Sequence, residues 1–220
     1  MPCRGGSSDF YWQGEASVIA AIVDIVSSRN VDAHERRRLD KELRALLKET
    51  IEGFKENCIA TPSLTQGDSI ELLVNSWQPI VFLFHRLLME DVEFRVGLGT
   101  GDVIIQKENA DECDGQAFWN AREALDGIKR TKYMNRSAAF RIDETSPNDE
   151  RMAVTSSVLL YTSLLGMSTV QLHHCYYYIW EKKRISEIAK ATRTSKGNVS
   201  KTLSKTPCYL LERVMTFLDH

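Results

Sequence analysis

The sequence contains no apolar run close to the ~20 residues that a membrane-spanning helix needs. It contains no C-x-x-C pair either, and its five cysteines are odd in number and widely scattered. They are Cys3, Cys58, Cys113, Cys175 and Cys208. This distribution argues against a disulfide framework and against a zinc site. We therefore expect a protein of the reducing cytoplasm with no membrane partner.

No charge of one sign dominates the chain, whose net charge is only −2, but the charges are unevenly distributed. Residues 181–205 carry eight lysines and arginines against two glutamates, a local charge of +6 that leaves −8 for the rest. A basic segment attached to an acidic body predicts a polyanionic partner for that segment alone.

The hydrophobic pattern alternates between strand-like and helix-like segments up to about residue 148. Residues 18–26, VIAAIVDIV, form a continuous apolar run broken by Asp24, which predicts a strand buried on both faces. Leucines then repeat at helical spacing over 39–54 and predict a long amphipathic helix. We further expect strands over 59–65 and 69–74 around a hairpin turn, a helix over 76–89, a strand pair within 93–106, a helix over 114–130 and a strand over 138–143.

The order strand, helix, strand, strand, helix, strand predicts an α+β class with a ferredoxin-like, split βαβ fold. Only helical patterns follow, and the charged, turn-rich segment 143–150 is the expected boundary. The predicted organisation is a flexible lead-in over 1–16, a ferredoxin-like domain over 17–146 and a helical domain over 147–220. Phe118 and Trp119, on the helix over 114–130, are expected in the core.

Two acidic residues are expected to meet at one end of the predicted sheet. In this topology the end of the first strand lies beside the hairpin tip, which would bring Asp24 close to Asp68. Two close carboxylates repel and are normally stabilised by a divalent cation, so Mg²⁺ is the predicted cofactor. The backbone and side chains around them are candidates for holding phosphate, namely those of Ile25, Ser27, Ser28, Arg29 and Gly67. The alternative is that the Gly-Asp pair is only a hairpin turn.

Four segments carry a resemblance to a known family. AIVDIVSSR, TQGDSIELL, FRVGLGTGDVI and DGQAFWNAREAL, in that order, resemble the SatD family of bacterial proteins, and the resemblance runs from Val18 over nearly all the rest of the chain. Three of these blocks are more distantly similar to the class III nucleotidyl cyclase domain. That similarity implies that Asp24 and Asp68 bind two metal ions, which hold a nucleoside triphosphate.

The sequence departs from the cyclase pattern at the positions that contact the base and the transition state. Leu64 stands where the cyclases have a base-contacting lysine, and Trp119 and Glu123 fall where they have asparagine and arginine. Positioned cations supply most of the rate in this kind of chemistry. The departures therefore favour a binding domain over a fast enzyme.

The basic segment contains the spacing of a helix-turn-helix over 184–203. Small Ala189 allows a second helix to cross closely, Val199 anchors that helix, and Ser195 is suited to cap it. In this motif the second helix enters the major groove of double-stranded DNA. The candidate DNA-binding residues are Arg193, Ser195, Lys196, Asn198, Ser200 and Lys201. The alternative is a helical bundle with a solvated basic face.

The histidines are interpreted as structural. His173 and His174 are adjacent on a helix and point to different faces, so they cannot share a metal with Cys175. The aromatic run 176–180 is expected to form core and scaffold for the helix-turn-helix, and His34 and His85 are interpreted as helix-surface or packing residues rather than general bases.

Three functional hypotheses follow from these residues. The first is a homodimeric DNA-binding transcriptional regulator that senses a nucleotide or another phosphorylated small molecule with Mg²⁺. The second is a two-metal nucleotidyl cyclase or nucleotidyltransferase tethered by its helical tail. The third is a degenerate domain that serves dimerisation only.

Overall fold

The computed structural model describes residues 18–26, 32–65, 69–131, 137–141, 161–162 and 164–218. The strands are β1 (Ile19–Ile25), β2 (Cys58–Leu64), β3 (Ser69–Val74), β4 (Phe94–Thr100) and β5 (Ser137–Arg141). The α-helices are α1 (Ala33–Phe54), α2 (Gln78–Met89), α3 (Gln116–Lys129), α5 (Thr169–Ile179), α6 (Ile185–Ala191), α7 (Lys196–Ser204) and α8 (Cys208–Leu218). Two short 3₁₀ turns, η1 (Lys55–Asn57) and η2 (Ala110–Glu112), complete the described elements.

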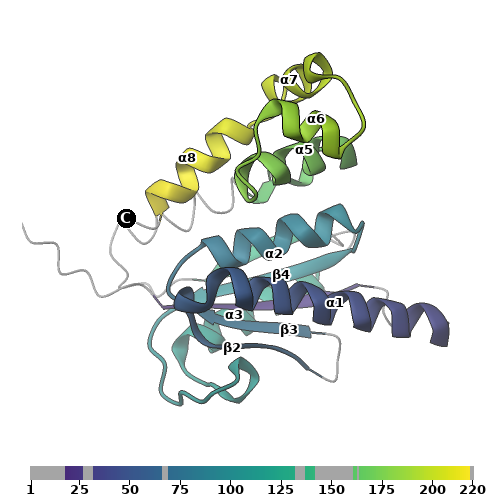
Figure 1. Ribbon diagram of the computed structural model, residues 1–220. Helices are drawn as coiled ribbons and strands as arrows, with labels where there is room; N and C mark the ends of the chain where they lie inside the picture. The colour runs from purple at the N-terminus through teal and green to yellow at the C-terminus, as the bar shows by residue number, and fades with distance from the viewer. Residues whose placement is uncertain are drawn as a thin grey trace, which may run out of the picture.

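The five strands form one mixed sheet in the order β2-β3-β1-β4-β5. β1 lies antiparallel between β3 and β4, and β5 runs parallel to β4 at the edge. The predicted position of the first strand beside the hairpin is confirmed, and this strand is the central one. Helices α1 and α2 cover one face of this sheet, α3 covers the other, and α5 to α8 are stacked beyond α2 (Figure 1).

The sequence of β1 explains its place at the centre. Its side chains alternate between two apolar environments, with Ala21 and Val23 on the face of α1 and α2 and with Ala20 and Ile22 on the face of α3. A strand buried on both faces needs a nearly continuous apolar run, and residues 18–26 provide one. The exception is Asp24, which lies near the end of the strand on the face of α3.

Helix α2 is apolar almost all round because it is buried from two sides. Nine of its twelve residues are buried, including His85. A helix of this kind belongs in an interior, since a surface helix has one polar face. Here α2 lies between the sheet and α5, so the sheet and the C-terminal helices share one hydrophobic core.

The predicted strand pair within 93–106 is wrong. Only β4 forms, and after Gly101, at a φ of 137°, residues 102–115 make two isolated bridges, one between Ile105 and Asp114 and one from Asn109 to Thr61 of β2. This segment closes over the face of α3 by burying Ala110 and Cys113. The burial of these apolar side chains against the sheet is the physical reason for the difference.

The glycines of β4 allow α3 to approach the sheet closely. A Cβ at Gly99 would lie 2.7 Å from the Asn120 Cβ, and one at Gly97 would lie 2.7 Å from the Leu125 Cβ. The G-L-G pattern of this strand therefore serves helix packing. Phe118 on α3 is fully buried as expected, whereas the expected burial of Trp119 is wrong, since this side chain is 46% exposed.

The N-terminal lead-in and the expected boundary at 143–150 lie outside the described residues. Within the described ranges, none of the helices combines the length and the apolar character that crossing a bilayer requires.

Candidate functional site

Asp24 is held by two cations at one end of the sheet. Its carboxylate lies 3.0 Å from Lys129 Nζ at the end of α3 and 3.8 Å from Arg95 Nη1 on β4. The Asp24 side chain is 20% exposed, so these partners offset the cost of burying a charge. Asp24 was predicted from the sequence, but its two partners were not. Lys129 reaches Asp24 only because of the way α3 crosses the sheet.

The described residues do not by themselves fit Mg²⁺ at Asp24. Mg²⁺ prefers several oxygen ligands, whereas Asp24 contacts two positive groups and Mg²⁺ would have to displace Lys129. Across the part of the chain that the structure describes, no group of three or more His, Cys, Asp or Glu side chains is placed to hold a metal ion. The predicted partner Asp68 lies outside the described residues, although Ser69, which follows it, pairs with Asp24 across the ladder.

The predicted phosphate-binding residues are only partly described. Ser27, Ser28, Arg29 and Gly67 lie outside the described residues. Ile25 is the last residue of β1, pairs with Phe94 and is 5% exposed. A role for this loop in holding phosphate therefore stays a prediction.

Glu71 is a polar residue that the sequence analysis passed over. It lies on β3 on the same face as Asp24, and its Oε2 is buried without a hydrogen-bond partner among the described residues. Burial raises the pKa of Glu71, while the nearby Arg122 opposes that shift. The signal in the sequence was a glutamate at an inward position of the alternating pattern SIELLV.

The basic segment folds as α6, a turn over residues 192–195, and α7. Ile188 and Ala189 of α6 are buried against Val199 and Leu203 of α7, so the predicted inward residues are confirmed. The turn closes with a hydrogen bond from the Thr194 N–H to the Ala189 carbonyl.

The turn places Arg193 in a left-handed conformation with a φ of 51°. Glycine is the residue most often used for this conformation. Ser195 caps α7 by accepting a hydrogen bond from the Asn198 N–H, at 3.1 Å. The Asn198 side chain donates to Thr194 Oγ1 at 2.9 Å, which orients its amide at the start of α7.

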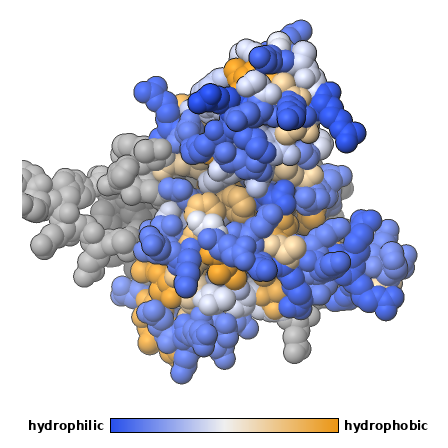
Figure 2. Space-filling view, viewed as in Figure 1, coloured by the Kyte–Doolittle hydropathy of each residue, from blue (hydrophilic) through white to orange (hydrophobic). Residues whose placement is uncertain are grey.

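All six candidate DNA-binding residues are brought together at the surface around this turn. Arg193, Ser195, Lys196, Asn198, Ser200 and Lys201 are all exposed. Lys190 and Lys205 add two exposed cations nearby. Figure 2 shows hydrophilic side chains predominating over this end of the molecule.

Comparisons with known proteins identify the family. The model of the SatD family matches residues 18–210, which is most of the chain. The chain belongs to the SatD family. No curated protein matches it. Among solved structures, it is similar to the crystal structure of a regulator of polyketide synthase expression from Bifidobacterium adolescentis, at 9% identity and a TM-score of 0.30, over 95% of this chain and 82% of that one.

In this SatD family member, one histidine joins the sheet part to the C-terminal helices. His85 on α2 contacts the Leu172 carbonyl through Nε2 at 2.9 Å and accepts a hydrogen bond from Trp180 Nε1 through Nδ1 at 3.0 Å. The ring is therefore neutral with its proton on Nε2, and each ring nitrogen has a hydrogen-bond partner. Burial lowers the pKa of His85 to about 4.

The aromatic run of α5 completes this junction of the SatD chain. The Trp180 ring lies edge-on to Phe82 of α2, with centroids 5.3 Å apart, and to Phe54 of α1 at 5.8 Å. Tyr176 lies beside Phe82 and His85. The half-buried rings of Tyr176 and Trp180 thus pack against the buried face of α2, so they tie the sheet part and the helical part together.

Removing the Asp24 carboxylate is expected to cost stability. We expect Asp24→Asn to lower the free energy of unfolding by about 1–2 kcal/mol, because Lys129 and Arg95 lose their partially buried counter-ion. Chemical denaturation of Asp24→Asn, Lys129→Gln and the double variant measures this. A coupling energy near zero would contradict the observed pairing and leave Asp24 available to a metal ion.

Proposed function

We propose that this chain is a DNA-binding transcriptional regulator that acts as a homodimer. In this proposal α6 and α7 form a helix-turn-helix, and α7 enters the major groove. The observation that carries the proposal is the outer surface of α7, which is exposed and basic. The inner faces of α6 and α7 are buried against each other through Ile188, Ala189, Val199 and Leu203. The alternative, a helical bundle with no polyanionic partner, gives no reason for lysines to be concentrated at one turn and at the start of one helix.

The side chains at the start of α7 suit both kinds of DNA contact. Lys196 and Lys201 are exposed point charges that suit phosphate, and Asn198 carries the donor and acceptor pair that suits adenine. The N-terminal residues of a recognition helix are the ones that meet base edges. Asn198 lies in the first turn of α7 and is oriented by Thr194.

The proposal gives the α/β part the role of sensing a phosphorylated ligand. The strand order around β1, with α1 and α2 joining β1 to β2 and β3 to β4, supports the ferredoxin-like interpretation. His85 and Trp180 supply a direct connection from α2 to the helix-turn-helix part. Mg²⁺ at Asp24 and Asp68 stays a prediction, and no step of the proposal depends on it.

The DNA-binding proposal is tested with a random-sequence duplex, since non-specific binding reports the phosphate contacts. With about four contacts, the affinity of the wild-type chain is expected to fall roughly 100-fold between 50 and 200 mM salt. The double variant Lys196→Gln/Lys201→Gln is expected to bind about 10-fold more weakly at 50 mM salt and to show a flatter salt dependence. Fluorescence anisotropy measures both.

The matched control is Lys41→Gln/Lys48→Gln, which removes the same charge from the exposed surface of α1. It is expected to keep the wild-type affinity. Equal weakening by the two double variants would show that only net charge matters, and a flat salt dependence of the wild-type chain would overturn the proposal.

A further inference from the structure

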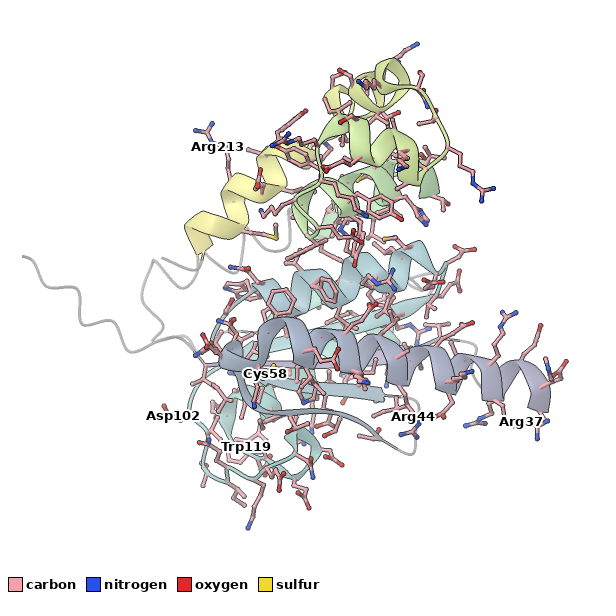
Figure 3. The ribbon with its side chains drawn as sticks, viewed as in Figure 1. Arg37, Arg44, Cys58, Asp102, Trp119 and Arg213 are labelled. Carbon is pink, nitrogen blue, oxygen red and sulfur yellow. The ribbon has the colours of Figure 1, made fainter. Side chains whose placement is uncertain are left out.

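A hydrophobic patch is exposed beside the start of α3. It consists of Ile104, which is 68% exposed, and of Ile105 and Trp119, each 46% exposed. The other large hydrophobic side chains that are exposed among the described residues lie on α5 and α8, in the helical part. Figure 2 shows hydrophobic side chains at the surface on this side of the molecule, at the lower left of the view. Figure 3 shows Asp102 and Trp119 on the same side, below the sheet.

Hydrogen bonds to Asp114 connect the three residues of this patch. The Asp114 carbonyl accepts from the N–H groups of Ile104 and Ile105, both at 2.9 Å, and the Asp114 N–H donates to the Ile105 carbonyl at 2.9 Å. The Asp114 carboxylate accepts from Trp119 Nε1 and from Arg122 Nη1, each at 3.0 Å. The backbone that carries the patch is therefore ordered in advance, which lowers the entropic cost of binding a partner.

The exposure of the two isoleucines serves no purpose in the fold of the segment 102–115. Ala110 and Cys113 are the residues by which this segment is buried, and Val103 packs against the same cluster. Ile104 and Ile105 are thus not needed to hold the segment on the face of α3. Exposed apolar side chains that lie together are a common sign of an interaction site.

The N-terminal end of β1 emerges beside this patch. Ile19 pairs with Thr100, which directly precedes the segment that carries the patch. Val18, the first described residue, packs against the same cluster as Val103. Since Ile104 follows Thr100 by four positions, it lies at most ~14 Å beyond it. The chain that precedes Val18 therefore starts close to the patch.

The sequence before Val18 carries side chains that suit an apolar surface. Phe10, Tyr11 and Trp12 are consecutive, and they are the only large apolar side chains between residues 4 and 17. We call residues 10–12 the aromatic segment. Eight positions separate Phe10 from Val18, and a chain of that length spans up to ~27 Å when it is extended. The aromatic segment can therefore reach the patch.

A segment of the same chain fits this patch better than a second copy does. The patch offers three side chains, whereas a stable dimer buries roughly 800 Å² on each partner. A tethered segment needs less contact, because its tether keeps it at an effective concentration in the millimolar range. Aromatic side chains also supply a large contact area at a low cost in conformational entropy.

We propose that the aromatic segment docks on the patch of the same chain. The docked segment covers the exposed apolar surface beside the start of α3 and gives the predicted lead-in a role as a cover. The inference goes beyond the proposed function, and it depends neither on DNA binding nor on a bound ligand. Because the contact is within one molecule, it is independent of the chain concentration.

Limited proteolysis of the full chain with chymotrypsin tests this proposal. The protease cuts after aromatic residues, and it reaches a docked segment only in the fraction of molecules in which that segment is released. Ile104→Ser/Ile105→Ser is expected to speed cleavage within the aromatic segment about 10-fold, the factor that corresponds to ~1.4 kcal/mol of docking. Trp119→Ala, which changes the patch from another element, is expected to speed it as well. Mass spectrometry identifies the fragments and their rates of formation.

The matched control is Val170→Ser/Leu210→Ser, which removes two exposed hydrophobic side chains from the helical part. This variant is expected to keep the wild-type rate of cleavage within the aromatic segment. Cleavage at buried aromatic residues in the same digest reports unfolding, and if one patch variant unfolds, the other decides the test.

Three results would overturn the inference. The first is the same cleavage rate in the wild type and in a folded patch variant. The second is an equal acceleration in the control variant. The third is a protection of the aromatic segment that increases with chain concentration, which would assign the patch to a second copy.

Discussion

Gly97→Ala is expected to lower the free energy of unfolding by about 3 kcal/mol or more, because the new methyl group has no space. It would fall on the Ala121 carbonyl oxygen of α3 and lie 2.7 Å from the Leu125 N and Cβ. These are backbone atoms and the root of a side chain, so a rotamer change cannot relieve the contact. The helix would have to move away from β4, and chemical denaturation monitored by circular dichroism measures the loss.

The matched control is Gly127→Ala on α3 itself. A Cβ at Gly127 meets nothing within 4 Å. Alanine there is expected to raise the stability by about 0.5–1 kcal/mol through helix propensity. If Gly97→Ala were as stable as Gly127→Ala, the close approach of α3 to β4 would be incorrect.

His85 is expected to make the chain less stable as the pH falls from about 6.5 to about 4. Burial depresses the pKa of His85 to about 4 in the folded state, from the ordinary value of 6.5. Above pH 6.5 the ring is neutral in both states, and its contribution is fully present. As the pH falls below 6.5 the unfolded chain binds a proton that the folded chain excludes, so stability declines by up to about 3 kcal/mol near pH 4.

Neighbouring groups also shift the pKa of His85. Arg86 and His173 add positive charge that lowers the pKa of His85 further, while its hydrogen bond to the Leu172 carbonyl raises that pKa. The comparison variant is His85→Gln, which keeps an amide donor and acceptor but does not titrate. The expected result is a smaller loss of stability between pH 6.5 and pH 4 in the variant than in the wild type, measured by urea denaturation at each pH. The same loss in both would contradict the prediction.

Much of the fold could be predicted because its elements are locally encoded. The apolar run 18–26 predicted a buried strand, and the apolar spacing over 39–54 predicted a helix with one buried face. The spacing of Ala189 and Val199 predicted the inner face of α6 and α7 for the same reason. In each case the buried side chains repeat at the period of the element that carries them.

The errors arose where packing between distant elements decided the outcome. Residues 102–106 look like a strand, yet they cross the face of α3 and leave Ile104 and Ile105 exposed. Trp119 was expected inside but donates from its ring N–H to Asp114 at the surface, at 3.0 Å. Neither the partner strand nor the covering loop can be read from local periodicity.

The candidate sites divide in the same way. The shared surface position of the six candidate residues around α7 was predictable, because one turn and one helix of continuous sequence hold them. The ion pairs of Asp24 were not, since they join residues far apart in the chain. His85 was interpreted as a helix-surface or packing residue, and its link to Leu172 and Trp180, 87 and 95 positions away, could not be predicted.

The sequence by itself determined most of the helices and strands and the inner face of the α6–α7 pair, because the repeat of apolar residues reports which side of each element is buried. Only the tertiary structure decided which side chains contact Asp24 and which elements α2 joins. Such contacts depend on the distances between elements. Hydrophobic periodicity shows which face of an element is buried, but it does not show which other element covers that face.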